Sequence, residues 1–260
     1  IIKGKTKKEI FFSSYICHPS MANNELSGPA LMTKVADYIK NIKNRNFSYR
    51  LVILPETIGS ISYIHKYKNK LKKNVICGFN LSCVGDEKSF SYISSKNGNT
   101  LADNALKSAL IGKQNVKYYS FLERGSDERQ YCAQGVELPV CGFSRTKYGE
   151  FKEYHTSADN LNLISNKGLE QSFEVIKSII DGFEKCFLPK TSIICEPNLG
   201  SRNMYPTVSV KDNYKKRNYI LDLITYSNGE DNIFEISQKT NIPLEILIQA
   251  YLILKSKKIF

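Results

Sequence analysis

The sequence predicts an α/β domain in which a mostly parallel sheet lies between two layers of helices, followed by a small winged-helix-like module. Apolar, strand-like runs alternate with segments of helical periodicity through the larger, first part of the chain. This alternation is typical of parallel sheets with helices on both faces. From Tyr214 the pattern changes to three short helical segments separated by tight turns, as in helix-turn-helix modules. We therefore expect an α/β domain at 1–187, a linker at 188–212 and a winged-helix-like domain at 213–260.

The elements of the α/β part follow from the spacing of apolar residues. Short apolar runs, several of them ended by Pro or by a polar turn, predict strands at 9–17, 50–54, 75–84, 116–122 and 138–144. Helical spacing or a lysine-rich exposed face predicts helices at 30–43, from about 59 to 73, at 99–112, at 126–133 and at 166–186. Because open α/β sheets bind ligands at the carboxyl ends of their strands, the polar residues after these strands are the first candidates for a site.

The last part of the chain offers a different class of function. Helix breakers punctuate the expected linker at Pro189, Pro197, Gly200 and Pro206. Helices are predicted near 219–224, at 233–240 and at 243–255. The third would be the recognition helix of a DNA-binding module, but it is almost entirely apolar, with Gln249 as its polar residue in mid-helix. Groove-reading helices need Arg, Lys, Asn or Gln on their exposed face, so we expect packing or contact with a protein partner here rather than nucleic acid binding.

Composition limits the class of protein. The 260 residues are 42% apolar and 24% charged, and the net charge is +12; the lysines are spread over separate segments, which favours solvated faces over a polyanion site. No apolar run approaches the roughly 18 residues of a membrane span. Seven cysteines without CxxC spacing fit a reducing, cytoplasmic location. Since the chain begins at Ile1 rather than Met, we expect it to lack an amino-terminal part.

Ionisable residues follow several predicted strands. His18, Glu56 and Asp86 each stand at or just after the end of one, and His155 lies in a polar, aromatic loop. Zinc is bound by His nitrogen and by Asp or Glu oxygen, so these residues form a candidate metal site. A hydrogen-bonded, structural role for each histidine is the alternative. Cys17 could be a nucleophile with His155 as its base, but we expect it to be buried at the end of its apolar run.

Five segments, in order, resemble the motifs of co-catalytic zinc aminopeptidases. They are His-Pro-Ser…Ala-Asn-Asn-Glu-Leu-Ser-Gly at 18–28, and the segments at 54–60, 80–85, 125–128 and 154–156. More closely, 124–160 and 196–202 resemble a bacterial aminopeptidase-like family that carries a C-terminal winged helix and is often linked with surface-polysaccharide gene clusters. The resemblance implies a sheet of zinc-exopeptidase type, one or two zinc ions, and hydrolysis of an N-terminal peptide or related amide bond in a peptide or aminoacyl substrate.

The resemblance also implies roles for individual residues. His18 and His155 would be the terminal metal ligands, and Glu56 would be a ligand or the general base. Asp127 matches a position that supports the site from outside the metal ligands.

The chain departs from the family motif at two ligand positions. Asn24 occupies the position of the metal-bridging aspartate, with Glu25 beside it, and Ser82 occupies that of a third ligand, which Asp86 could replace. The expected metal set is therefore His18, Asn24, Asp86 and His155, with Glu25, Ser82 and Asp127 around it. A neutral amide cannot hold two dications together. The first alternative function is thus a catalytically degenerate binding or scaffold protein associated with surface-polysaccharide biosynthesis, and the second is a transcription regulator.

Overall fold

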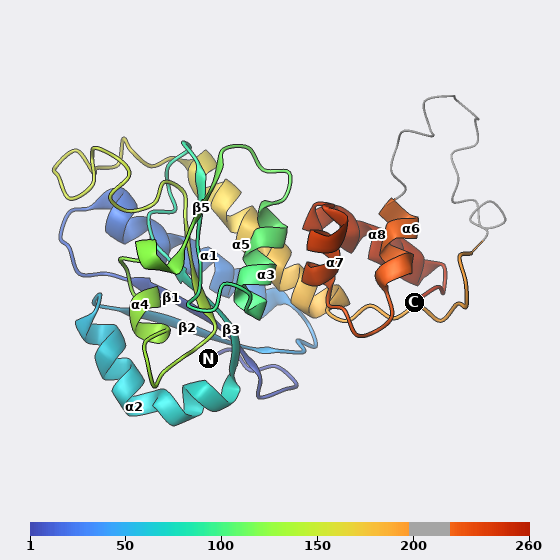
Figure 1. Ribbon diagram of the computed structural model, residues 1–260. Helices are drawn as coiled ribbons and strands as arrows, with labels where there is room; N and C mark the ends of the chain where they lie inside the picture. The colour runs from blue at the N-terminus through green and yellow to red at the C-terminus, as the bar shows by residue number, and fades with distance from the viewer. Residues whose placement is uncertain (198–218) are drawn as a thin grey trace.

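A mixed six-stranded sheet forms the centre of the molecule. The computed structural model describes residues 1–197 and 219–260 (Figure 1). The strands are β1 Glu9–Tyr15, β2 Ser48–Leu54, β3 Val75–Leu81, β4 Phe90–Ile93, β5 Val116–Tyr119 and β6 Val140–Ser144. Their order is β2-β1-β3-β6-β4-β5. Strands β2, β1, β3 and β6 are parallel, whereas β4 runs antiparallel to β6 and pairs in parallel with β5. The carboxyl ends of β1, β2, β3 and β6 therefore meet at one edge of the sheet.

Helices cover both faces of this sheet. They are α1 Ser27–Asn41, α2 Ile58–Asn74, α3 Leu101–Leu110, α4 Glu128–Tyr131 and α5 Asn166–Cys186, with a π-helix η1 at Ala22–Leu26 and a 3-10 helix η2 at Phe121–Glu123. Successive residues of β1 point to opposite faces: Ile10 and Phe12 pack in the core with α1, α3 and α5, and Phe11 packs with α2 and α4. The expected α/β fold, with a mostly parallel sheet between helical layers, is confirmed.

Strand β4 is the one element of the sheet that the sequence does not predict. It has only four residues, and its buried Ser91 and Tyr92 break the continuous apolar run that marks a central strand. It is fixed by its neighbours instead, because it fills the position between β6 and β5. The long helix α5 has the predicted bounds, and the Ser165 side chain caps it by accepting a hydrogen bond from the Gly168 N–H.

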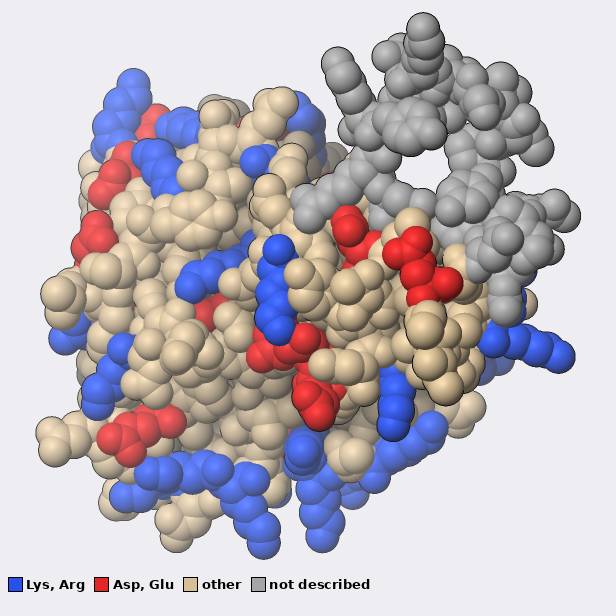
Figure 2. All heavy atoms as spheres, turned by 45° about the vertical axis from the view of Figure 1, so that its right-hand side comes forward, with Lys and Arg blue, Asp and Glu red and all other residues tan. Residues whose placement is uncertain are grey.

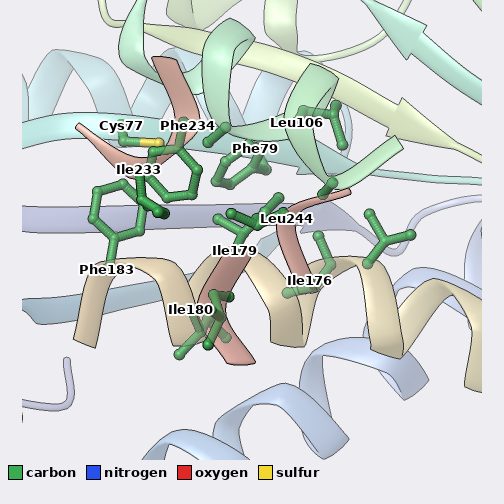
Figure 3. Close-up of a cluster of buried hydrophobic side chains, with 14 of the residues drawn as sticks. Cys77, Phe79, Leu106, Ile176, Ile179, Ile180, Phe183, Ile233, Phe234 and Leu244 are labelled. Atoms are coloured by element: carbon green, nitrogen blue, oxygen red, sulfur yellow. The ribbon is translucent and has the colours of Figure 1, made fainter. Parts of the chain in front are cut away.

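The C-terminal helices share the core of the α/β domain. They are α6 Tyr219–Tyr226, α7 Ile233–Thr240 and α8 Leu244–Ser256. Figure 3 shows side chains of α7 and α8 packed against α5, with Phe234 close to Phe183; their ring centroids are 4.9 Å apart. The contact is tight, because a Cβ added at Gly182 would lie 2.8 Å from the Phe234 ring. The apolar face of α8 is thus buried by packing, which is the role expected for it in preference to DNA reading.

The expected domain bounds stay a prediction. Residues 198–218, which include most of the expected linker and the start of the last domain, lie outside the described part. Among the described residues, no helix combines the length and apolar character of a membrane span. On the face shown in Figure 2, basic side chains lie in several groups with acidic side chains between them, as on a solvated surface.

Candidate metal and catalytic site

The loop after β1 turns back so that Glu25 reaches His18. Glu25 lies in the π-helix η1 and is 1% exposed. Its Oε1 is 2.6 Å from Nδ1 of His18, and its Oε2 accepts the Cys17 N–H at 2.6 Å. The Asn24 side-chain amide donates to Oε1 at 3.2 Å. Glu25, expected beside the metal ligands, is therefore a buried carboxylate in direct contact with the half-exposed His18 ring.

The expectation that Cys17 is buried is wrong. Cys17 is exposed because β1 ends at Tyr15 and the chain then leaves the sheet. Its Sγ lies 3.3 Å from His18 Nδ1 and 3.8 Å from Glu25 Oε1, and accepts the Glu56 N–H at 3.4 Å. Partial burial of the sulfur raises the pKa of the Cys17 thiol, and the carboxylates of Glu25 and Glu56 raise it further. A nucleophilic cysteine needs the opposite shift, so the structure does not favour that role.

His155 is brought next to His18 by a loop far away in sequence. The ring centroids of the two histidines are 4.7 Å apart, and the His155 ring stacks on Tyr154 at 3.9 Å. His155 is exposed and has a φ of +55°, in the left-handed region that a non-glycine residue seldom adopts. Such a conformation persists only where surrounding contacts hold it.

The contact that holds the His155 loop comes from Asp159. Its carboxylate is completely buried and accepts the backbone N–H groups of Asn23 at 2.6 Å and Asn24 at 3.0 Å. These N–H groups begin η1, where a carboxylate is favourable. Asp159 thus joins the loop that carries His155 to the segment after β1 that carries His18. Sequence reasoning missed this residue, because its partners are distant in the chain and no local spacing connects them.

Glu56 follows β2 and faces the same site. Burial raises the pKa of Glu56, and the nearby Asp127 carboxylate adds to this, against the hydrogen bond from Ser126 and the charges of Arg129 and His18. Its backbone N–H contacts the Cys17 sulfur. Glu56 is therefore a carboxylate whose proton affinity is increased, as a general base near neutral pH requires.

Asp127 anchors the turn that carries Glu56. Its Oδ1 accepts hydrogen bonds from the Thr57 N–H and the Ser60 hydroxyl, both at 2.8 Å. Thr57 has a φ of +60°, so the turn is a conformation that needs such support. Arg129 also donates to the Thr57 hydroxyl, at 2.8 Å. The role expected for Asp127, to support the site from outside the metal ligands, stays a prediction. These hydrogen bonds show how Asp127 could do so, by holding the turn that follows Glu56.

The other expected residues have different neighbours. Asn24 Oδ1 accepts the Tyr15 hydroxyl at 2.9 Å, and Ser82 is buried beside the same tyrosine. Asp86 is 2% exposed, and its two oxygens accept four hydrogen bonds, from Asn23, the Lys88 N–H and two groups of Thr146. Metal ligation by Asn24 or Asp86 stays a prediction.

Within the described residues, the group of His, Cys, Asp and Glu side chains close enough to share a metal ion is Cys17, His18 and Glu25. Their ligand atoms lie within 4.8 Å of one another. The structure thus brings His18, His155 and Glu56 to one edge of the sheet and places Cys17 and Glu25 next to His18. The roles expected for the site residues stay predictions.

Solved structures that share this fold define the class. A zinc aminopeptidase from Bacillus subtilis matches 68% of this chain and 47% of its own, with a TM-score of 0.59 and 18% identity. A glutaminyl cyclase from an Acidobacteriales bacterium matches 70% of this chain and 71% of its own, with a TM-score of 0.59 and 17% identity. At these identities the likeness shows the fold alone, and the chain has an aminopeptidase-like fold.

Two family models match the chain, one after the other. The chain belongs to the family described as a domain of unknown function (DUF4910), which matches residues 1–186. Residues 187–260 match a winged helix-turn-helix family. The expected resemblance to an aminopeptidase-like family with a C-terminal winged helix is confirmed.

A solved structure and a curated sequence from Clostridium acetobutylicum are similar to nearly all of this chain. The crystal structure, of a protein provisionally named a peptidase, matches 99% of this chain and 58% of its own, with a TM-score of 0.84 and 32% identity. The curated sequence, provisionally named a polysaccharide biosynthesis protein with an aminopeptidase-like domain, is 35% identical over 248 residues. That match covers 93% of this chain and 56% of the relative. The chain thus spans little more than half the length of these relatives.

Proposed function

We propose that the protein is a metal-dependent hydrolase of aminopeptidase type that cleaves an N-terminal peptide bond or a related amide bond. The observation that carries the proposal is the meeting of His18, His155 and Glu56 at the carboxyl edge of the sheet. Open α/β sheets bind their ligands at this edge. The substrate is a peptide or an aminoacyl compound, as the aminopeptidase-like fold suggests.

The residues present fit a zinc ion. Imidazole nitrogen and carboxylate oxygen are zinc ligands, and His18 has Glu25 at 2.6 Å and the His155 ring close by. His18 would hold the ion, with Glu25 in contact with this histidine and the His155 ring beside it. A bound zinc ion supplies a Lewis acid that polarises the scissile carbonyl and makes water a better nucleophile at neutral pH.

The residues of the chain would position and transfer protons. Glu56 would take a proton from the attacking water and deliver it to the leaving amine. A raised pKa suits both steps, because the carboxylate then accepts the proton more readily and the carboxyl group still gives it up near neutral pH. Asp127 would hold Glu56 in place by accepting the N–H of the next residue, Thr57. The exposed His155 would contact the substrate on the solvent side.

The test compares Glu56→Gln with Glu174→Gln, an exposed glutamate on α5. The full-length protein, loaded with zinc, manganese or cobalt, is assayed on a panel of aminoacyl amides. Loss of a general base costs about 100-fold to 10,000-fold in rate, so Glu56→Gln should lose that much activity and Glu174→Gln should keep it. A protein that binds metal but hydrolyses no member of the panel, or a Glu56→Gln variant of normal activity, would contradict the proposal.

A second candidate is a binding or scaffold protein in surface-polysaccharide biosynthesis. It is supported by Asn24, a neutral amide hydrogen-bonded to Tyr15 and Glu25 at the position of a bridging carboxylate. The provisional name of the Clostridium acetobutylicum relative supports the biological setting. Metal-loaded protein without hydrolytic activity would favour this candidate.

A further inference from the structure

The groups nearest to His18 form a donor set that includes sulfur. Resting on the proposed function, we propose that Cys17 and Glu25 join His18 as the protein ligands of one metal ion. The site would then hold its ion through one sulfur, one nitrogen and one oxygen. Cys17 binds as the thiolate, and its proton passes to solvent on metal binding.

The distances within the cluster fit this arrangement. Zinc–sulfur bonds are about 2.3 Å and zinc–nitrogen or zinc–oxygen bonds about 2.0–2.1 Å, so the edges of a tetrahedron that involve sulfur measure about 3.6 Å. The Cys17 sulfur lies 3.3 Å from His18 Nδ1 and 3.8 Å from Glu25 Oε1. The third edge, from Nδ1 to Oε1, is 2.6 Å, the length of a hydrogen bond. Only this edge has to lengthen, by less than about 1 Å, to admit the ion.

The charge of Glu25 gives an independent reason for a cation at this place. Its side chain is 1% exposed, and within the described part of the chain His18 is its ion-pair partner. A buried carboxylate is costly unless it is paired with a cation or binds a metal. Histidine is a cation only when it is protonated, so a metal ion would compensate this charge more fully.

Hydrogen bonds around the cluster orient the side chains that would bind the metal. The Glu56 N–H donates to the Cys17 sulfur at 3.4 Å, and the Cys17 N–H donates to Glu25 Oε2 at 2.6 Å. The Asn24 amide donates to Glu25 Oε1. Metal ligands are commonly oriented by such outer hydrogen bonds. Asn24 then orients a ligand rather than acting as one.

This donor set also fits a catalytic site. Catalytic zinc sites have three protein ligands and one position open to water or substrate. Cys17, His18 and Glu25 supply three, and the His155 ring, 4.7 Å from that of His18, lies beside them. The site therefore needs neither a second ion nor Asp86.

The experiment follows cobalt binding to the full-length, metal-free protein without oxygen. A thiolate ligand gives a near-ultraviolet charge-transfer band with cobalt, which nitrogen and oxygen ligands do not give. We expect this band to saturate at about one ion per chain, to disappear in Cys17→Ser, and to persist in Cys195→Ser, the variant of the other exposed cysteine. X-ray absorption of the zinc-loaded, unmutated protein should show one sulfur at about 2.3 Å, a result that does not depend on the variant folding.

The outcomes separate the two proposals. Metal binding without the band and without a sulfur neighbour would overturn the role of Cys17 and leave the proposed hydrolase intact. A protein that binds no metal would overturn both. The band with saturation at two ions per chain would retain the thiolate and overturn the single-ion site.

Discussion

The tether formed by Asp159 allows a quantitative prediction. In Asp159→Asn the side chain keeps one oxygen, so it can accept only one of the two N–H groups that the carboxylate accepts now, at 2.6 and 3.0 Å. A hydrogen bond to a charged group contributes about 1.5–3 kcal/mol, and a buried N–H left without a partner costs about 1–3 kcal/mol. We therefore expect the free energy of unfolding to fall by about 2–4 kcal/mol.

Thermal unfolding measures this loss. For a chain of this size each kcal/mol lowers Tm by about 2–4 °C, so Asp159→Asn should lower it by about 4–16 °C. The exposed Asp37→Asn serves as the control and should stay within about 0.5 kcal/mol of the unmutated protein. The variant should also bind metal more weakly, because one of the hydrogen bonds that join the loop of His155 to the loop of His18 is lost. A change in stability no larger than that of the control would refute this account of the loop.

Two further predictions concern charge. Burial opposes ionisation of Asp181, but hydrogen bonds from Tyr38 and two lysines of α5 together lower its pKa. The ionised Asp181 therefore stabilises the fold fully above the ordinary pKa of about 3.9, and this stabilisation is lost as pH falls through the lowered pKa. Urea unfolding across this acid range should show Asp181→Asn destabilised at neutral pH and approaching the unmutated protein at low pH, whereas a constant difference would contradict the assignment. Asn24→Asp replaces the N–H that donates to Glu25 Oε1 with a second carboxylate, so the zinc affinity should fall by about 10-fold or more in a competition titration; unchanged affinity would count against the placement of the metal.

The sequence predicted the regular elements well and the local contacts of the site less well. The amphipathic spacing of 166–186 defines α5 at both ends, because its apolar stripe and its cap are local. The carboxyl-edge position of His18 and Glu56 follows from strand order alone. Strand β4 depends on its neighbours, and no four-residue pattern reveals it.

The contacts of Cys17 and Glu25 depend on backbone geometry that the spacing of residues in the sequence does not reveal. The π-helix η1 turns Glu25 back onto His18, and the end of β1 at Tyr15 leaves Cys17 outside the sheet. A π-helical turn has no simple signature in sequence. Asp159 escaped notice for a related reason, since a carboxylate that caps a distant helix start looks like any polar loop residue.

We infer that the edge of the sheet at His18 holds a catalytic metal ion. The decisive measurement is the metal content of the full-length protein, purified without chelators and determined together with the protein concentration. We expect about one equivalent of zinc per chain, greatly reduced when His18 is replaced by alanine. Purified protein without metal, and unable to take up zinc, manganese or cobalt, would contradict it.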